Sequence, residues 1–181
     1  MRRGKIRRKE KPSGGAPLTI ETGSLFQIVT TLCASSLFRK AASRFSRCGF
    51  AVFSTTRPSS FLSEGLVVHL ERHRLARAGR DDLSRKVQWV AVEIGDGLGF
   101  DVLSFDDLDE SEKLIEVKTT GLGKFFPFYV TGNEVRCSED MTDQFHLFRV
   151  FDFGRTPRIY ILTGSLNINC RLEPTQYLAM I

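Results

Sequence analysis

Apolar residues at helical spacing mark the first regular element of the chain. Leu62, Leu66 and Leu70 recur every four residues, and charged side chains occupy the positions between them. This spacing places the three leucines on one face of a helix that begins near Phe61. Gly79 follows and provides a favourable helix end. We therefore expect an amphipathic helix between these two points.

Shorter runs further along the chain follow the pattern of strands, with glycine-rich or acidic segments between them. The expected strands are Val87–Val92, Phe100–Phe105, Leu114–Thr120, Phe125–Val130, Phe145–Phe151 and Arg158–Leu162. The acidic segment 106–112 reads as the loop of a hairpin, and Thr131 as the N-cap of a second helix. A helix, a three-strand meander, a helix and further strands predict a mixed α/β domain.

Charge divides the chain into two parts. Residues 1–60 carry twelve Lys and Arg and two acids, net +10, whereas the remaining residues carry fourteen against nineteen, net −5. We therefore expect residues 1–58 to form a disordered basic arm and residues 59–181 to form the folded domain. The arm is poor in acids, which is typical of a transit peptide and equally of translation from upstream of the true start. The basic pI describes the arm and says little about the domain.

The four cysteines and the apolar stretches exclude several classes of protein. Cys33, Cys48, Cys137 and Cys170 are widely scattered and show no metal-binding spacing, and no signal peptide is evident. The longest apolar stretch, Ser24–Phe38, is short and interrupted by polar residues. We expect reduced thiols, a cytoplasmic location and no association with a membrane.

The expected strand around Glu116 contains the candidate chemistry. Alternation places Ile115 and Val117 on one face of the strand, and Glu116 and Lys118 on the other. If this strand pairs with the preceding one, Asp101 converges on Glu116. Two carboxylates are what Mg²⁺ requires of a protein when phosphate and water supply its other ligands. Taken alone, however, an acid and a lysine two residues apart more often form a surface ion pair.

The surrounding motifs favour a functional site over a surface ion pair. They are Val87-Gln88-Trp89-Val90, Gly95-Asp96-Gly97-Leu98-Gly99-Phe100-Asp101 and Ile115-Glu116-Val117-Lys118-Thr119-Thr120, with Pro127 to Glu134 and Phe145 to Val150 further on. In this order and spacing they resemble the family of the C-terminal domain of the plant protein NO VEIN. The resemblance runs from about residue 60 to the end of the chain and leaves the first third unmatched.

The resemblance implies a restriction-endonuclease-like fold of the PD-(D/E)xK nuclease superfamily, a mixed sheet core flanked by helices. It further implies Asp101 and Glu116 as ligands of Mg²⁺ or Mn²⁺, and Lys118 as the catalytic lysine. Glu64, on the first helix, occupies the place of a further catalytic acid. Ser63 precedes it where the family usually has glycine, which weakens that assignment, and Glu71 is the alternative.

Two functions remain open. The first is a metal-dependent nuclease that cuts phosphodiester bonds in DNA, within a larger defence or repair assembly. The second is a catalytically inactive nuclease fold that binds nucleic acid or protein. The net charge of −5 on the domain favours the second, because an acidic surface holds a polyanion poorly.

Five other residues carry weaker signals. Trp89 reads as a core residue, and His69 with His73 as a solvated helix face. Glu134 fits either helix capping or a place beside the site. Arg149, a single charge in an apolar strand, fits contact with a phosphate or pairing with an acid.

Overall fold

The computed structural model describes residues 59–153, 156–176 and 179. The expected basic arm, residues 1–58, lies outside the described residues, as do Cys33 and Cys48. Cys137 and Cys170 are both free thiols. Within the described part of the chain, no helix has the length and apolar character needed to cross a membrane.

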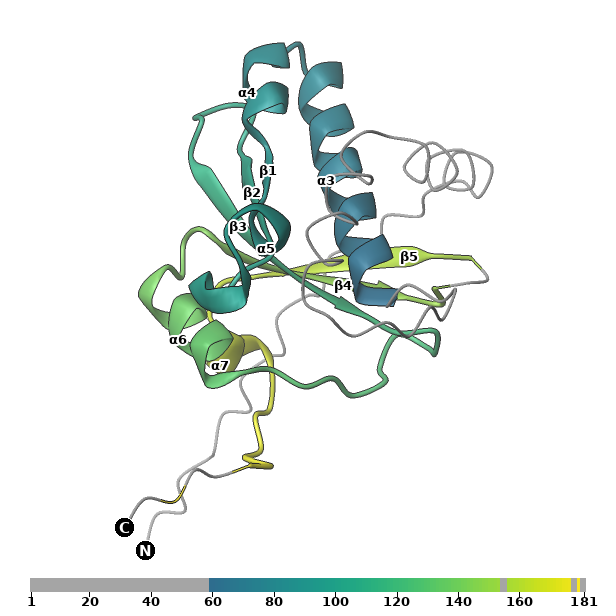
Figure 1. Cartoon of the computed structure of the whole chain (residues 1–181), viewed down its shortest axis with the longest axis vertical. Coiled ribbons are helices and arrows are strands. Elements are labelled where there is room, and N and C mark those ends of the chain that lie inside the picture. The colour runs from purple at the N-terminus through teal and green to yellow at the C-terminus, as the bar shows by residue number, and fades with distance from the viewer. Residues whose placement is uncertain (1–58, 154–155, 177–178, 180–181) are drawn as a thin grey trace, which may run out of the picture.

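The described residues form a mixed five-stranded sheet with helices packed against it (Figure 1). In chain order the elements are α3 (Ser59–Arg77), α4 (Asp81–Lys86), β1 (Gln88–Trp89), α5 (Val90–Glu93), η1 (Asp96–Leu98), β2 (Val102–Phe105), β3 (Glu112–Thr119), α6 (Gly132–Asp140), β4 (Phe145–Phe151), β5 (Arg158–Thr163) and α7 (Leu166–Asn169). The strands lie side by side in the order β1-β2-β3-β4-β5, and only β3 and β4 are parallel. The α/β prediction is confirmed.

Helix α3 covers one face of the sheet and closes the larger core. Val67 and Leu75 of α3 pack with Ile115, Val117 and other apolar strand residues in one buried cluster. Helix α3 ends at Arg77, and Gly79 follows with a φ of 77°, a conformation that glycine adopts without strain. The predicted first helix and its glycine stop are therefore confirmed.

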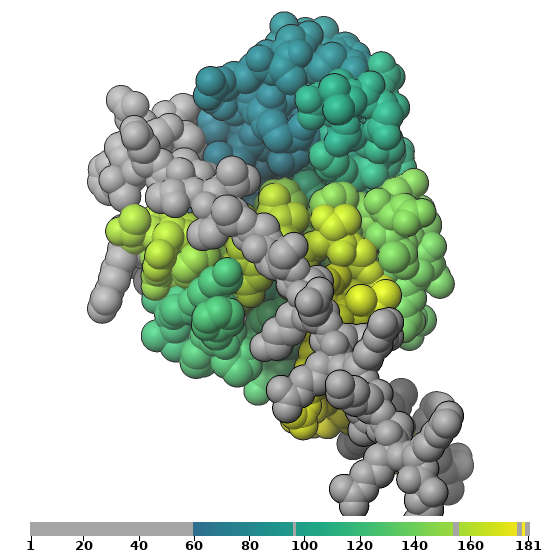
Figure 2. Space-filling view, turned by 180° about the vertical axis from the view of Figure 1, so that it is seen from behind, coloured from purple at the N-terminus to yellow at the C-terminus, as the bar shows by residue number. Residues whose placement is uncertain are grey.

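The opposite face of the sheet is covered by α6, α7 and the segment that leads into α6. Phe145 and Leu147 of β4 form a second, smaller cluster there with Leu166 of α7. Seen from behind in the space-filling view, α3 and α4 occupy the top of the molecule, and the tip of the β2–β3 hairpin lies beside them (Figure 2). Ion pairs join these parts, among them Arg74 to Asp107 at 2.6 Å and Arg80 to Glu110 at 2.6 Å.

Two predicted strands are wrong in whole or in part. Val87–Val92 forms only the two-residue β1 before the chain turns into α5, where the carbonyl of Val90 accepts bonds from the N–H groups of Ile94 and Gly95. Phe125–Val130 forms no strand. This segment crosses the face of the sheet, where Phe128 and Val130 pack on the second cluster and the Phe126 carbonyl accepts a bond from a side chain of β4. Its apolar residues therefore pack against a sheet and pair with no strand.

Candidate active site

The pairing of strands β2 and β3 ends at the candidate site. Their last paired residues are Val102 and Ile115, and the Asp101 N–H still donates to the Ile115 carbonyl at 2.9 Å. Two residues further along β3, the backbone N–H of Val117 donates to Asp101 Oδ2 at 2.8 Å. This side-chain bond takes the place of a backbone bond between the two strands. The divergence of the strands leaves Asp101 next to Glu116, as the hairpin pairing predicts.

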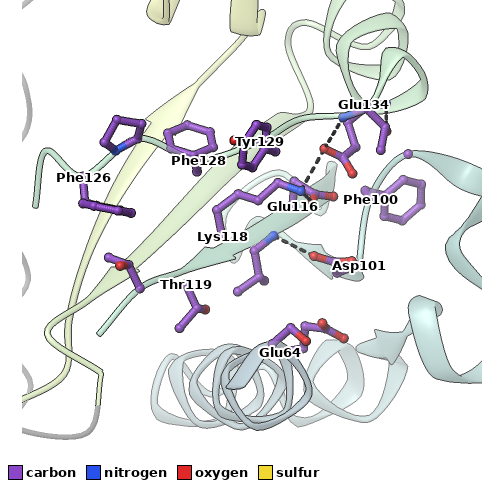
Figure 3. A pocket seen from close by; sticks show the side chains of 16 residues that line it. Glu64, Phe100, Asp101, Glu116, Lys118, Thr119, Phe126, Phe128, Tyr129 and Glu134 are labelled. Atoms are coloured by element: carbon purple, nitrogen blue, oxygen red, sulfur yellow. Dashed lines mark hydrogen bonds and ion pairs between the residues drawn. The ribbon is translucent and has the colours of Figure 1, made fainter. Parts of the chain in front are cut away.

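Glu116 and Lys118 project from the α6 face of β3 into a charged cluster (Figure 3). Glu116 is 3% exposed. The Lys118 ammonium lies 2.8 Å from Glu116 Oε1 and 2.9 Å from Glu134 Oε2. Lys118 therefore pairs with two carboxylates, and a third, that of Asp101, acts on Glu116.

This excess of acid over base alters the ionisation of the cluster. Burial and the carboxylates of Asp101 and Glu134 raise the pKa of Glu116 to about 9, although Lys118 acts in the opposite direction. The pKa of Lys118 is raised above its ordinary value, because the two glutamates outweigh the effect of its burial. The cluster thus holds Lys118 protonated and carries more negative charge than one lysine balances.

The N-terminus of α6 supplies the third carboxylate through a capping box. Thr131 Oγ1 accepts the Glu134 N–H, and Glu134 Oε2 accepts the Thr131 N–H at 3.1 Å. The same Oε2 atom pairs with Lys118. Both open readings of Glu134 therefore hold, since it caps the helix and also reaches the site.

A glycine-rich turn holds α6 close to β2. Asn133 Nδ2 donates to the Gly97 carbonyl at 2.6 Å. Gly99 has a φ of 84°, and a Cβ there would lie 2.8 Å from Cys137 Cβ and 2.9 Å from the Asn133 carbonyl oxygen. Any larger residue at Gly99 would push α6, and Glu134 with it, away from Lys118.

The cluster opens into a pocket of about 600 Å³. The acids Glu64, Asp101, Glu116 and Glu134 line it together with Lys118. Phe126, Phe128 and Tyr129, from the segment before α6, line it as well (Figure 3). Sequence reasoning missed this aromatic wall, because it assigned the segment to a strand.

Comparison with known proteins agrees with the motifs. The family model described as Protein NO VEIN, C-terminal, matches residues 63–162, more than half of the chain. The chain belongs to this family. No curated protein and no solved structure matches it.

Within this NO VEIN C-terminal domain, the two candidate helix acids lie in different places. Glu64 lies in the pocket wall on α3, pointing toward Asp101, and its Oε2 accepts the indole N–H of Trp89 at 3.0 Å (Figure 3). Glu71 does not line the pocket. Its carboxylate accepts bonds from Arg74 and from the hydroxyl of Ser104. The structure therefore places Glu64 beside the proposed metal ligands and Glu71 outside the site.

The donor set at the pocket suits a hard divalent cation. Among the residues that the structure describes, no group of three or more His, Cys, Asp or Glu side chains is arranged to hold a metal ion. A metal would therefore rest on two protein carboxylates, those of Asp101 and Glu116, with substrate and water completing its shell. Glu116 is buried among other acids, and a cation would relieve that repulsion. The residues present fit Mg²⁺ or Mn²⁺.

The other residues singled out in the sequence do not line the pocket. Trp89 is buried and packs on Phe61, with ring centroids 4.7 Å apart, which confirms it as a core residue. His69 and His73 stack on each other, with ring centroids 6.5 Å apart, and neither lines the pocket. Arg149 is buried and forms no ion pair with an acid among the described residues.

Proposed function

We propose that this domain is a Mg²⁺- or Mn²⁺-dependent nuclease that hydrolyses phosphodiester bonds in DNA. One observation carries the proposal: Asp101 and the buried Glu116 converge where two strands diverge, and Lys118 is held beside them on an open pocket. A buried acid among other acids is costly unless a cation joins it. A surface ion pair, the plainer explanation of Glu116 and Lys118, would be neither buried nor next to two further carboxylates.

Each residue has a separate role in this proposal. Asp101 and Glu116 would hold the metal, which when bound would lower the pKa of a water molecule and offset the charge of the phosphate. Lys118 is held protonated by Glu116 and Glu134, and its ammonium would donate to the phosphate oxygens as negative charge develops on them. Glu64 would orient a water molecule from the α3 side of the pocket.

The alternative is a binding module that has the nuclease fold but no activity. The net charge of −5 on the residues after position 60 supports it, since the domain repels a polyanion at long range. We place either function in the cytoplasm and in a larger defence or repair assembly, with DNA as the partner of the nuclease and nucleic acid or protein as the partner of the binding module.

A cleavage assay with a matched lysine control tests the proposal. The full chain is incubated with supercoiled plasmid and with single-stranded DNA in Mg²⁺, Mn²⁺ or EDTA. We expect cleavage only with metal, and a loss of about a hundredfold or more in Asp101→Asn and in Lys118→Ala. Lys113→Ala is the control, because Lys113 lies on the same strand and pairs with Asp106 at 2.8 Å, away from the pocket.

The outcomes separate the two functions. Equal cleavage by the Lys118→Ala and Lys113→Ala variants would mean that Lys118 takes no part in the reaction. Binding of DNA without cleavage in any metal, unchanged by Asp101→Asn, would favour the binding module.

A further inference from the structure

The segment between β3 and α6 presents aromatic side chains to solvent beside the candidate site. Phe125 is 89% exposed, Tyr129 82% and Phe126 49%. Phe126 and Tyr129 also line the pocket that contains Asp101 and Glu116 (Figure 3). A group of large exposed aromatic rings is unusual on a soluble surface and marks a place of contact. We call residues 121–130 the aromatic loop.

A row of side chains on the sheet holds this loop from beneath. Lys118 pairs in register with Arg149, and Arg149 with Tyr160, so the three lie side by side on one face of β3, β4 and β5. Arg149 Nη2 donates to the Phe126 carbonyl at 2.8 Å, and the Phe128 ring lies 4.9 Å from its guanidinium. The Tyr160 hydroxyl donates to the Lys124 carbonyl at 3.4 Å. Because the backbone is anchored on this row, the outer rings are held away from the core.

Two cations, Arg149 beneath the aromatic loop and Lys124 within it, lie close to the pocket but do not line it. Arg149 is 1% exposed, and its Nε and Nη1 atoms have no hydrogen-bond partner among the described residues. No ion pair in the described part of the chain includes Arg149 or Lys124. The Lys124 ammonium lies 5.6 Å from the Phe125 ring centroid and 4.9 Å from that of Tyr160. The pocket therefore has an acidic wall and an aromatic wall, and Lys124 lies outside it, near the rings of Phe125 and Tyr160.

Aromatic rings interleaved with cations are the arrangement that binds single-stranded nucleic acid, in which bases stack on the rings and the backbone follows the positive charge. In a duplex the faces of the bases are already stacked on one another and cannot reach such rings. We propose that the aromatic loop is a stacking platform for unpaired nucleobases, so that the domain selects single-stranded nucleic acid over duplex. This inference rests on the proposed function, since a metal held at the acidic wall is what would engage the backbone there.

A protein segment is the other occupant that exposed rings could accept. The observations favour nucleobases, because Lys124 lies near the rings of Phe125 and Tyr160, and Phe126 and Tyr129 line the same pocket as the carboxylates. An apolar protein segment would gain nothing from a buried guanidinium with two nitrogen atoms that lack a hydrogen-bond partner among the described residues.

Binding in EDTA, where the metal-dependent reaction cannot run, tests the platform apart from cleavage. The full chain is titrated into fluorescently labelled oligothymidylate, and separately into a duplex of equal length, while anisotropy is recorded. We expect tighter binding of the single strand, and a loss of about tenfold or more in the double variant Phe126→Ala, Tyr129→Ala. Leu108→Ala is the control, since Leu108 is 88% exposed and does not line the pocket. It should bind like the wild type.

Tyr129→Ala alone keeps the test decisive if the double variant is unstable, because its ring is mostly exposed. It should weaken binding of the single strand by about fivefold or more and leave binding of the duplex unchanged. Equal binding of single strand and duplex by the wild type, or unchanged single-strand binding by Tyr129→Ala, would overturn the inference. If the chain prefers single-stranded DNA but cleaves no DNA, the nuclease proposal is wrong and the stacking platform stands. If it cleaves duplex DNA and shows no preference for the single strand, only the stacking platform is wrong.

Discussion

A buried glutamate lies near each of the two ends of the β2–β3 hairpin, and the two have different surroundings. At the closed end, Glu71 of α3 is 5% exposed and receives bonds from Arg74 and from Ser104 Oγ at 2.6 Å. Arg74 in turn pairs with Asp107 at 2.6 Å. Each charge there has a partner of opposite sign or a hydrogen-bond donor.

At the open end, Glu116 is also buried, but its neighbours include other acidic side chains. Asp101 and Glu134 lie nearby, and Lys118 is shared between Glu116 and Glu134. A pocket of about 600 Å³ adjoins this end, and Glu71 does not line it. The comparison separates an acid that stabilises the fold from acids whose charge is left for a ligand.

Removal of Glu71 should have the largest effect on stability. Glu71→Ala leaves Ser104 and part of Arg74 without a partner inside the domain, and we expect the free energy of unfolding to fall by about 3 kcal/mol. Urea denaturation checks this, with Glu112→Ala, an exposed acid on β3, as the control. Metal binding by the folded fraction should be unaffected. A loss below about 0.5 kcal/mol would remove the contrast between the two ends.

Glu116→Gln should behave in the opposite way. The substitution keeps the side chain neutral, which is the form that the raised pKa of Glu116 favours, and the amide oxygen can still accept a bond from Lys118. In EDTA we expect the free energy of unfolding to stay the same or rise by up to about 1 kcal/mol. The same urea measurement decides. A fall comparable to that of Glu71→Ala would mean that Glu116 stabilises the fold.

A pH series at the hairpin loop gives the smallest expected effect. The pairing of Asp106 with Lys113 lowers the pKa of Asp106 to about 2. An acid with a lowered folded-state pKa stabilises the fold above its ordinary pKa of about 3.9, and this contribution disappears as pH falls toward 2. Because the pair is partly exposed, we expect Asp106→Asn to cost about 0.2–1 kcal/mol at pH 6 and nothing at pH 2. An equal cost at both pH values would assign the effect to packing.

Much of the fold was predictable from the sequence because local patterns and tertiary structure agree. The first helix, the β2–β3 hairpin, β4, β5 and the Thr131 cap all follow from periodicity or capping residues. The aromatic loop is the exception, since Phe125–Val130 has the composition of a strand. Its path depends on Arg149, which lies beside Lys118 only because β3 and β4 are parallel neighbours. Periodicity along a single segment carries no information about such a neighbour.

The candidate site was predictable to a similar extent. Alternation places Glu116 and Lys118 together, the hairpin brings Asp101 to them, and the family motifs select these residues among many acids. The role of Glu134 beside Lys118 was left open, because a capping box by itself accounts for that glutamate. The separation of Glu64 from Glu71 needs the tertiary contacts of Ser104 and Arg74, which helical spacing does not reveal.

Calorimetric titration with Mn²⁺ tests whether Asp101 and Glu116 form a metal site. We expect the wild-type chain to bind Mn²⁺ at one site near neutral pH, and binding to weaken by about tenfold or more in Asp101→Asn. Glu71→Gln, which changes the other buried glutamate, should bind Mn²⁺ as the wild type does. If the wild-type chain binds no Mn²⁺, or if Asp101→Asn binds it equally well, the paired carboxylates of Asp101 and Glu116 are not a metal site.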